Sequence, residues 1–374
     1  MATDAANTAA ACAGCGAKLQ HDDPQQPGYA PKEAMDRETV ICRRCFRIKH
    51  YNEISEITVQ EDDFLRVLNR IGTAPGFIVH IVDLFDLDGS LIGSLHRFAG
   101  GNPIVLAANK IDLFPKNVNR NRILSRVQKR VKEAGLKPLG IVLCSAKRSE
   151  GFDRLIGLLK NRPAGTDIFV VGATNVGKST LINRLIRDFS DLDAELTVSR
   201  YPGTTLDMVH IPLEDGRAII DTPGIVYKSR LTEIVDKADL AAILPEKPIR
   251  PLVYQLNERQ TLFFGALVRF DFVKGERQSF TCYVSGGLKV HRTKLERASE
   301  VYEEHKGGLL SPPAGDRLGK LPPWTRHAIR IPPGGPKDVF VSGLGWIKAN
   351  GLTGCDLVVH APKGVKVIVR DPLI

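Results

Sequence analysis

A glycine-rich run that ends in lysine and serine, residues 172–179, has the composition of a loop that holds phosphate groups. It follows an apolar run and precedes a helical pattern, which is the strand–loop–helix order that such a loop requires. Lys178 would reach the β and γ oxygens, and the Ser179 hydroxyl would ligate Mg²⁺. The expected phosphate-binding residues are Thr174, Asn175, Val176, Gly177, Lys178, Ser179 and Thr180.

Two further motifs predict the remaining metal and γ-phosphate ligands. Asp221 ends an alternating strand and would hold the metal through water, while the Gly224 amide would face the γ-phosphate. Either Thr204 or Thr205 would supply a second hydroxyl to the metal, and we favour Thr205. The position after Gly224 is Ile225, where many GTPases keep a Gln that orients the attacking water. Slow intrinsic hydrolysis, stimulated by a cation or a partner, is therefore expected.

A second group of motifs predicts guanine selectivity. The carboxylate of Asp112 can accept two hydrogen bonds from N1 and N2 of guanine, which adenine cannot offer. Lys110 would lie along the base, and the Ala146 amide would meet the O6 acceptor. The expected nucleotide is GTP or GDP, and the expected base-binding residues are Asn109, Lys110, Asp112, Ser145, Ala146 and Lys147.

The order of these motifs is unusual. The guanine motifs at 109–112 and 145–147 precede the phosphate loop at 172–179, the threonines at 204–205 and the Asp221 motif, although they normally close such a domain. A nucleotide site is assembled in space, so a circular permutation keeps the chemistry and moves the chain ends. The permutation also places the segment after Gly224 directly before the C-terminal region.

Asn175 has two interpretations. Its amide oxygen could ligate a monovalent cation, K⁺, near the bridge between the β and γ phosphates, where positive charge would stabilise the transition state. Alternatively, Asn175 only braces the loop. The sequence leaves both open.

Four cysteines predict a metal site at the N-terminus. They form two C-x-x-C pairs, a spacing that lets both sulfurs of a pair bind one tetrahedral ion. Zn²⁺ in a structural role is expected, because four thiolates leave no open position for a substrate. The predicted ligands are Cys12, Cys15, Cys42 and Cys45.

Composition limits the class of protein. Among 374 residues, 43% are hydrophobic and 25% are charged, which is typical of a globular protein. No apolar stretch approaches the ~20 residues that span a bilayer, and residues 1–11 have the composition of a disordered leader and not of a signal peptide. The three remaining cysteines are scattered, which argues against a disulfide framework. A cytoplasmic location without a membrane partner is expected.

The net charge of +10 is concentrated at the C-terminal end. Residues 228–374 hold 23 Lys and Arg against 15 Asp and Glu, which points to an anionic partner, with nucleic acid favoured over membrane. Two basic segments, 43–51 and 291–294, would suit RNA contacts, and solvated basic turns remain the alternative for both.

Strands alternate with helices from residue 61 to residue 226, which predicts an α/β fold with a doubly wound, mostly parallel sheet. After Val226, alternating apolar stretches at 277–284, 339–346 and 363–370 predict antiparallel strands in a β-rich α+β domain. The segment 309–336, rich in Pro and Gly, predicts a long loop. His80, inside an apolar strand, is interpreted as a core histidine. The expected domains are a zinc finger (12–55), a permuted P-loop GTPase domain (56–227) and a C-terminal domain (228–374).

The chain resembles the YqeH family of circularly permuted bacterial GTPases. The resemblance covers nearly the whole chain, and it rests on the permuted motifs together with Cys12-x-x-Cys15-Gly16, Pro27-Gly28-Tyr29, Cys42-x-x-Cys45-Phe46, His50-Tyr51-Asn52-Glu53, Pro202-Gly203-Thr204-Thr205-Leu206-Asp207 and Gly343-Leu344-Gly345-Trp346. It implies GTP hydrolysis, a C-terminal RNA-binding domain, and a role with rRNA in assembly of the small (30S) ribosomal subunit. DNA is not an expected partner.

Two other functions remain alternatives. One is a GTPase subunit coupled to RNA modification, although no additional methyl-donor, flavin or redox motif is visible. The other is a translation factor that acts on mature ribosomes.

Overall fold

The structure is a computed structural model, and it describes residues 11–13, 17–24, 28–35, 37, 39–43, 45–47, 58–59, 61–162, 165–189, 208–213 and 217–374. Residues 1–10, Cys15, Thr204 and Thr205 lie outside the described residues, as does most of the basic segment 43–51. The chain forms two compact units, each described below by itself. The first is Met1–Leu84, Ser90–Lys110 and Arg130–Val226, and the second is Phe85–Gly89, Ile111–Lys129 and Tyr227–Ile374.

The first unit contains a six-stranded sheet in the order β4-β3-β2-β5-β7-β6. Neighbouring strands are parallel except at the β6–β7 edge, which is antiparallel. The strands at the centre, β2 and β3, are buried along their whole length, which explains their continuous apolar sequences. The bounds are β2 (Gly76–Asp83), β3 (Ile104–Asn109), β4 (Gly140–Leu143), β5 (Asp167–Gly172), β6 (Val209–Pro212) and β7 (Ala218–Asp221).

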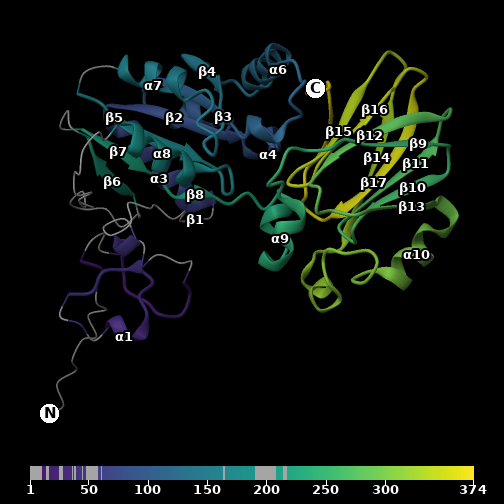
Figure 1. Ribbon diagram of the computed structural model, residues 1–374, viewed down its shortest axis with the longest axis horizontal. Helices are drawn as coiled ribbons and strands as arrows, with labels where there is room; N and C mark the ends of the chain where they lie inside the picture. Colours follow the sequence, from purple (N-terminus) through teal and green to yellow (C-terminus); the bar gives the residue numbers. More distant parts are fainter. Residues whose placement is uncertain are drawn as a thin grey trace. The chain divides into compact units, whose positions relative to one another are not determined.

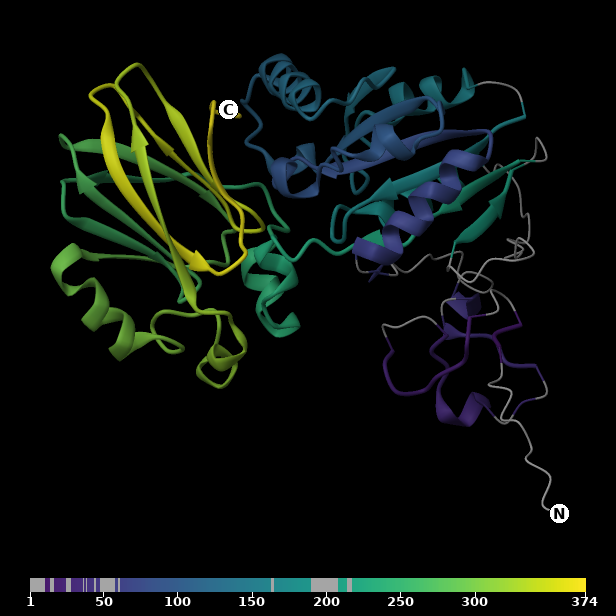
Figure 2. The same cartoon turned by 180° about the vertical axis from the view of Figure 1, so that it is seen from behind.

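Helices flank this sheet on both faces (Figures 1 and 2). The predicted fold, a permuted P-loop GTPase domain with a doubly wound sheet, is confirmed. The helices along this part of the chain are α3 (Glu61–Thr73), α4 (Leu87–Ser90), α5 (Leu95–Phe98), η1 (Ile111–Leu113), α6 (Arg120–Glu133), α7 (Phe152–Lys160) and α8 (Lys178–Phe189). Three short elements are α1 (Lys32–Met35), β1 (Thr58–Val59) and β8 (Gly224–Ile225).

His80 is a core histidine, as predicted. It is fully buried in β2, its Nδ1 lies 3.3 Å from the Val171 carbonyl oxygen, and its Nε2 accepts a hydrogen bond from the Ile92 amide at 3.1 Å. Burial lowers the pKa of His80 to about 4, and the hydrogen bond to Val171 opposes this shift only in part. The neutral ring therefore joins β2 to the strand that leads into the phosphate loop.

The second unit is built on a sandwich of two five-stranded antiparallel sheets (Figures 1 and 2). Their strand orders are β13-β10-β11-β17-β14 and β18-β15-β16-β12-β9. The strands are β9 (Leu252–Leu256), β10 (Gln260–Phe264), β11 (Val268–Lys274), β12 (Gln278–Val284), β13 (Val290–Lys294), β14 (Trp324–Ile331), β15 (Lys337–Val341), β16 (Gly345–Ala349), β17 (Cys355–Pro362) and β18 (Val367–Arg370). The helical segments are η2 (Leu231–Glu233), α9 (Lys237–Ile243), η3 (Leu295–Arg297), α10 (Ala298–His305) and η4 (Gly315–Lys320).

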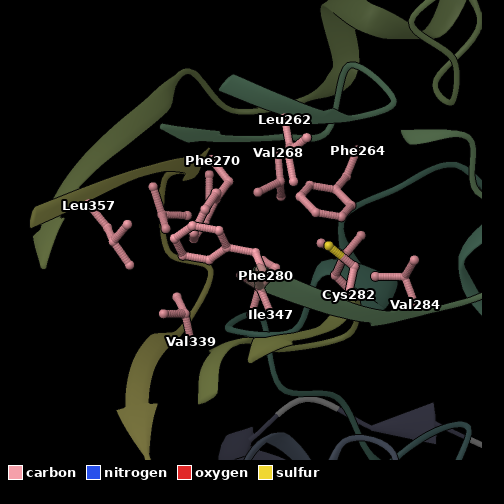
Figure 3. Close-up of a cluster of buried hydrophobic side chains, with 14 of the residues drawn as sticks. Leu262, Phe264, Val268, Phe270, Phe280, Cys282, Val284, Val339, Ile347 and Leu357 are labelled. Atoms are coloured by element: carbon pink, nitrogen blue, oxygen red, sulfur yellow. The ribbon is translucent and has the colours of Figure 1, made fainter. Parts of the chain in front are cut away.

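The core of the sandwich consists of alternating inward side chains from both sheets (Figure 3). Phe280 of β12 packs against Phe270 of β11, with ring centroids 5.4 Å apart in an edge-to-face arrangement that aromatic quadrupoles favour. Leu262, Val339, Ile347 and Leu357 complete the same layer. The predicted β-rich C-terminal region is confirmed.

Three details of the sequence-based strand assignment were wrong. The stretch 363–370 is a strand only from Val367 onward, because residues 363 and 364 form the turn that follows β17. The stretch 339–346 is a hairpin and not one strand, because Gly343 turns the chain with φ +80° between β15 and β16. The segment 309–336 is not one long loop, since it contains the eight-residue strand β14, which pairs with β17 along its whole length. Prolines on both sides of β14 concealed it, although proline at the ends of an edge strand removes no ladder hydrogen bond.

Candidate nucleotide site and cysteine cluster

The phosphate loop joins β5 to α8, as its sequence requires. Two residues take left-handed backbone conformations, Asn175 with φ +61° and Gly177 with φ +89°. A side chain at Gly177 would place its Cβ 2.5 Å from Asn109 Nδ2, so glycine is needed for close approach of the guanine motif. The same Asn109 nitrogen donates to the Val176 carbonyl at 2.8 Å. Val176 and Thr174 are buried, and Thr180 is exposed.

Asn109 connects three motifs that are distant in sequence. Its amide nitrogen bonds the phosphate loop, and its Oδ1 accepts a hydrogen bond from the Ala146 amide at 2.9 Å. Asn109 is 2% exposed, so these bonds form away from water. Asn109 therefore contacts both the second guanine motif and the phosphate loop, despite the permuted order in the chain.

The other residues of the guanine motifs differ in exposure. Ser145 is buried and its hydroxyl accepts from the Arg148 amide at 3.1 Å, which closes the turn of the second motif, whereas Lys147 is exposed. Lys110 has φ +70°, an unusual conformation for a residue with a Cβ. Asp112 is half-buried in η1, at the start of a segment that belongs to the second unit.

A charged pair lies where β5 and β7 end side by side. The Lys178 ammonium donates to the Asp221 carboxylate, and both side chains are fully buried. The neighbouring Ser179 hydroxyl is buried and has no hydrogen-bond partner among the described residues. A carboxylate and an unused hydroxyl are the oxygen ligands that Mg²⁺ takes, so the residues fit this ion.

Gly224 and Ile225 form a strand, β8, directly after the Asp221 motif. They pair in parallel with β1, and the Ile225 carbonyl accepts a hydrogen bond from the Thr174 amide at 2.9 Å. The Ile225 side chain is 4% exposed. The position where many GTPases keep a catalytic Gln is thus a buried apolar residue, tied to the phosphate loop through its backbone.

Three of the four predicted zinc ligands come together. The sulfurs of Cys12, Cys42 and Cys45 lie within 4.8 Å of one another, and all three residues are 2% exposed. The Cys42 amide donates to the Cys12 sulfur at 3.1 Å, which ties the two cysteine segments together. This donor set could hold a thiophilic metal ion.

Sequence reasoning missed one group of buried polar residues. Asp83 ends β2, Asp86, Asp88 and Ser90 come after it, and all four are buried. The signal was present in the sequence, since three carboxylates and a hydroxyl within eight residues, at and just after the end of a buried strand, are uncommon in a plain connection.

Comparisons with known proteins agree with this geometry. A family described as YqeH-like, C-terminal, matches residues 277–373, and one described as 50S ribosome-binding GTPase matches residues 167–261. Uncharacterized protein YqeH of Bacillus subtilis is 45% identical over 363 residues, covering 97% of this chain and 99% of that protein. A putative nitric oxide synthase of Oryza sativa is 30% identical over 98% of this chain and 78% of its own length.

A shorter match is to another GTPase. GTPase Der of Xanthomonas axonopodis is 33% identical over 167 residues, which is 40% of this chain and 32% of that protein. Among the described residues, no helix has both the length and the apolar character needed to cross a membrane. The predicted GTP binding and hydrolysis are therefore confirmed at the level of the family. With its permuted motifs, P-loop fold and near-full-length similarity, the chain belongs to the YqeH family of GTPases.

Proposed function

We propose that this GTPase is an assembly factor for the small (30S) ribosomal subunit, and that its nucleotide state controls binding of rRNA by the C-terminal sandwich. The observation that supports this most directly is the course of the chain after the γ-phosphate motif. Gly224 lies in the first unit, and from Tyr227 onward the chain belongs to the second. Contacts that order this segment around GTP would act on the sandwich, and loss of the γ-phosphate would release it.

The nucleotide would be held as the motifs indicate. Asn109, Lys110, Asp112 and Ala146 bind guanine, and Lys178 binds the β and γ oxygens. Mg²⁺ is held by Ser179, Thr205 and Asp221, while Gly224 contacts the γ-phosphate. A K⁺ ion at Asn175 would compensate for Ile225, which cannot orient water.

The zinc finger is proposed to comprise residues 12–55, followed by the GTPase domain at 56–227 and the RNA-binding domain at 228–374. Cys15 would complete a four-cysteine Zn²⁺ site with the three gathered cysteines. Zinc content of the purified protein, measured by atomic absorption, should be one per chain and should be lost in Cys42→Ser. A fully folded, zinc-free protein would exclude this site.

The C-terminal charge supports an RNA partner. Residues 228–374 have an excess of eight cations over anions, which suits phosphate neutralisation. One similar family is described by its binding to the 50S subunit. A ribosomal partner is therefore in keeping with the comparisons, and the choice of subunit needs a direct measurement.

Sedimentation of cell extract would make that measurement. With a non-hydrolysable GTP analogue, the tagged protein should move with immature 30S particles, and with GDP it should stay at the top of the gradient. Lys178→Ala should remain at the top with either nucleotide. Movement with polysomes would instead favour a translation factor, and movement with 50S particles would contradict the subunit assignment. Crosslinking to rRNA in the 30S fraction would then identify the binding site.

A further inference from the structure

Residues 83–90, which carry none of the nucleotide motifs, contain four buried polar side chains. Asp83 and Asp86 are each 2% exposed, Asp88 is 6% exposed, and Ser90 is fully buried. A buried carboxylate is costly unless it is paired and hydrogen-bonded, so these side chains indicate specific partners. The segment also passes from the first unit to the second and back, because Phe85–Gly89 belongs to the second.

At its first residue, the segment contacts the guanine motif. Asp83 Oδ2 accepts a hydrogen bond from Lys110 Nζ at 2.6 Å, and the same ammonium donates to the Asn175 carbonyl at 2.5 Å. The Asp83 backbone is itself held, since its amide donates to the Ser90 hydroxyl at 3.0 Å. Asp83 thus fixes the ammonium of Lys110 against the phosphate loop. With its ammonium held in this way, the alkyl part of the Lys110 side chain can lie along the guanine base.

In the middle of the segment, Asp86 contacts the chain that follows the γ-phosphate motif. Arg230 Nε donates to Asp86 Oδ2 at 2.7 Å, and the Ser342 hydroxyl donates to Asp86 Oδ1 at 3.0 Å. Arg230 is fully buried. The Leu231 amide also donates to the Ser342 carbonyl at 2.9 Å. One carboxylate therefore joins the segment after Gly224 to the β15–β16 hairpin.

Two further contacts fix this arrangement. The Asp88 carboxylate accepts from the buried Arg370 guanidinium, and the Asp88 carbonyl accepts from Lys366 Nζ at 2.9 Å. At Gly89, a Cβ would lie 2.1 Å from the Ser342 hydroxyl and 2.4 Å from Asp86 Oδ1, so a side chain there would disturb the hydrogen bond between these two groups.

We propose that residues 83–90 are a further functional element of this GTPase, which links the guanine motif to the sandwich. Asp83 is a positioning residue for Lys110, and Asp86 couples the segment after Gly224 to the β15–β16 hairpin. The proposal rests on the proposed nucleotide site and on the coupling proposed above, and it adds a second covalent route between them. A buried ion pair of this kind contributes less to the free energy of unfolding than well-packed apolar side chains would. Its best-attested role is to specify a single arrangement of the segments that it joins.

The positioning role of Asp83 is tested by nucleotide affinity. In Asp83→Asn, the affinities for GDP and for IDP should fall equally, by about tenfold, because a charge-assisted hydrogen bond to Lys110 is lost. The two losses are equal because Lys110 does not contact the 2-amino group of guanine, which IDP lacks. Competition by inorganic tripolyphosphate should not change, since Lys178 and the loop amides remain. A purely structural defect would weaken tripolyphosphate as well. Unchanged GDP affinity, or equal losses for all three ligands, would overturn the role of Asp83.

The coupling role of Asp86 is tested by hydrogen exchange on the full-length protein. In the wild type, a non-hydrolysable GTP analogue should slow amide exchange at 231–234 and 342–344 by about threefold or more. Asp86→Asn should abolish this response and leave GDP affinity within about twofold. Asp271→Asn is the matched control, because Asp271 is also 2% exposed and accepts from an arginine and a hydroxyl. It should keep the full response.

The outcomes separate the two proposals. A response that persists in Asp86→Asn, or that is lost equally in Asp271→Asn, overturns the link through residues 83–90. If the wild type binds GDP but the GTP analogue does not slow amide exchange at 231–234 and 342–344, the link through residues 83–90 is also overturned. The proposed nucleotide site would be unaffected by that result. If Asp86→Asn fails to fold, Asp86→Asn combined with Arg230→Gln removes both charges, and the same loss of response is expected. Absence of guanine binding in the wild type would refute the nucleotide site itself.

Discussion

Asp86 and Asp271 are chemically similar but differ in the origin of their partners. Each is 2% exposed and accepts from an arginine Nε, at 2.7 Å for Asp86 and 2.8 Å for Asp271, and from a hydroxyl, at 3.0 Å and 2.6 Å. The partners of Asp271 all lie in its own sheet, namely Thr261 on β10, Arg269 on β11 and His360 on β17, whose Nε2 is 3.3 Å from Asp271 Oδ2. Those of Asp86 lie 144 and 256 residues away, in two separate segments. The local cluster orders one sheet face, and the remote cluster joins separate segments.

The same distinction holds around the nucleotide site. Asn109 reaches partners 67 and 37 residues away, and Lys178 pairs with Asp221 at a separation of 43. Each of these contacts joins strand ends of the parallel sheet, where a doubly wound fold places its ligand. The contacts of Asn109 and Lys178 therefore join separate segments at the nucleotide motifs, as those of Asp86 do after Gly224, whereas the Asp271 cluster stays within one sheet.

The largest expected difference between Asp86 and Asp271 is in the free energy of unfolding of their alanine variants. Asp86→Ala leaves Arg230 buried without its carboxylate, and should cost about 3–5 kcal/mol of the free energy of unfolding. Asp271→Ala should cost about 1–3 kcal/mol, because Arg269 is partly exposed and can be hydrated. Both tryptophans, Trp324 and Trp346, lie in the second unit, so their fluorescence in urea reports its unfolding. Equal losses would show that burial of the arginine partner does not set the cost.

The rate of GTP hydrolysis should depend on the Lys178–Asp221 pair and not on the Asp271 cluster. Lys178→Ala should lower GTP hydrolysis at least a hundredfold, roughly 2.7 kcal/mol, because the cation at the phosphates is removed. Arg269→Ala, in the local cluster, should keep turnover within about twofold. Phosphate release at saturating GTP provides the measurement. Normal turnover in Lys178→Ala would contradict the assignment of the phosphate loop.

Acid should weaken the first unit through His80. Its pKa in the folded protein is about 4, below the ordinary value of 6.5, so the unfolded chain binds more protons between these values. Stability is therefore lost as the pH falls through this window, by about 2 kcal/mol between pH 7 and pH 5. His80→Gln should remove this part of the pH dependence in urea titrations followed by circular dichroism. An identical pH dependence in both proteins would refute it.

The smallest expected effect concerns the cation at Asn175. Hydrolysis by the wild type should be about fivefold faster in K⁺ than in Na⁺ at equal ionic strength, on the order of 1 kcal/mol. Asn175→Gly should lose this difference and keep guanine affinity. Glycine is the suitable replacement because φ is +61° at this position, where alanine would be strained. Equal rates in both salts for the wild type would assign activation to rRNA or a protein partner.

Much of the molecule was predictable from local pattern. Every strand of the parallel sheet that the sequence predicted is present, and the α6 bounds, Arg120–Glu133, are those expected. These features depend on apolar spacing within one element, which a sequence displays directly. The strand β14 and the hairpin at Gly343 were not recognised, because prolines and glycines mark both loops and strand ends.

By itself, the sequence determined the nucleotide chemistry and the family, since the phosphate loop, the guanine motifs and Ile225 act through residue type at fixed short spacing. Tertiary structure alone decided the partners of Asp83, Asp86 and Asp88. Asp83 meets Lys110 across 27 residues, and Asp88 meets Arg370 across 282. No periodicity spans such distances. The pairing follows from which strand ends and turns the fold brings together, and from the cost of leaving a buried charge alone.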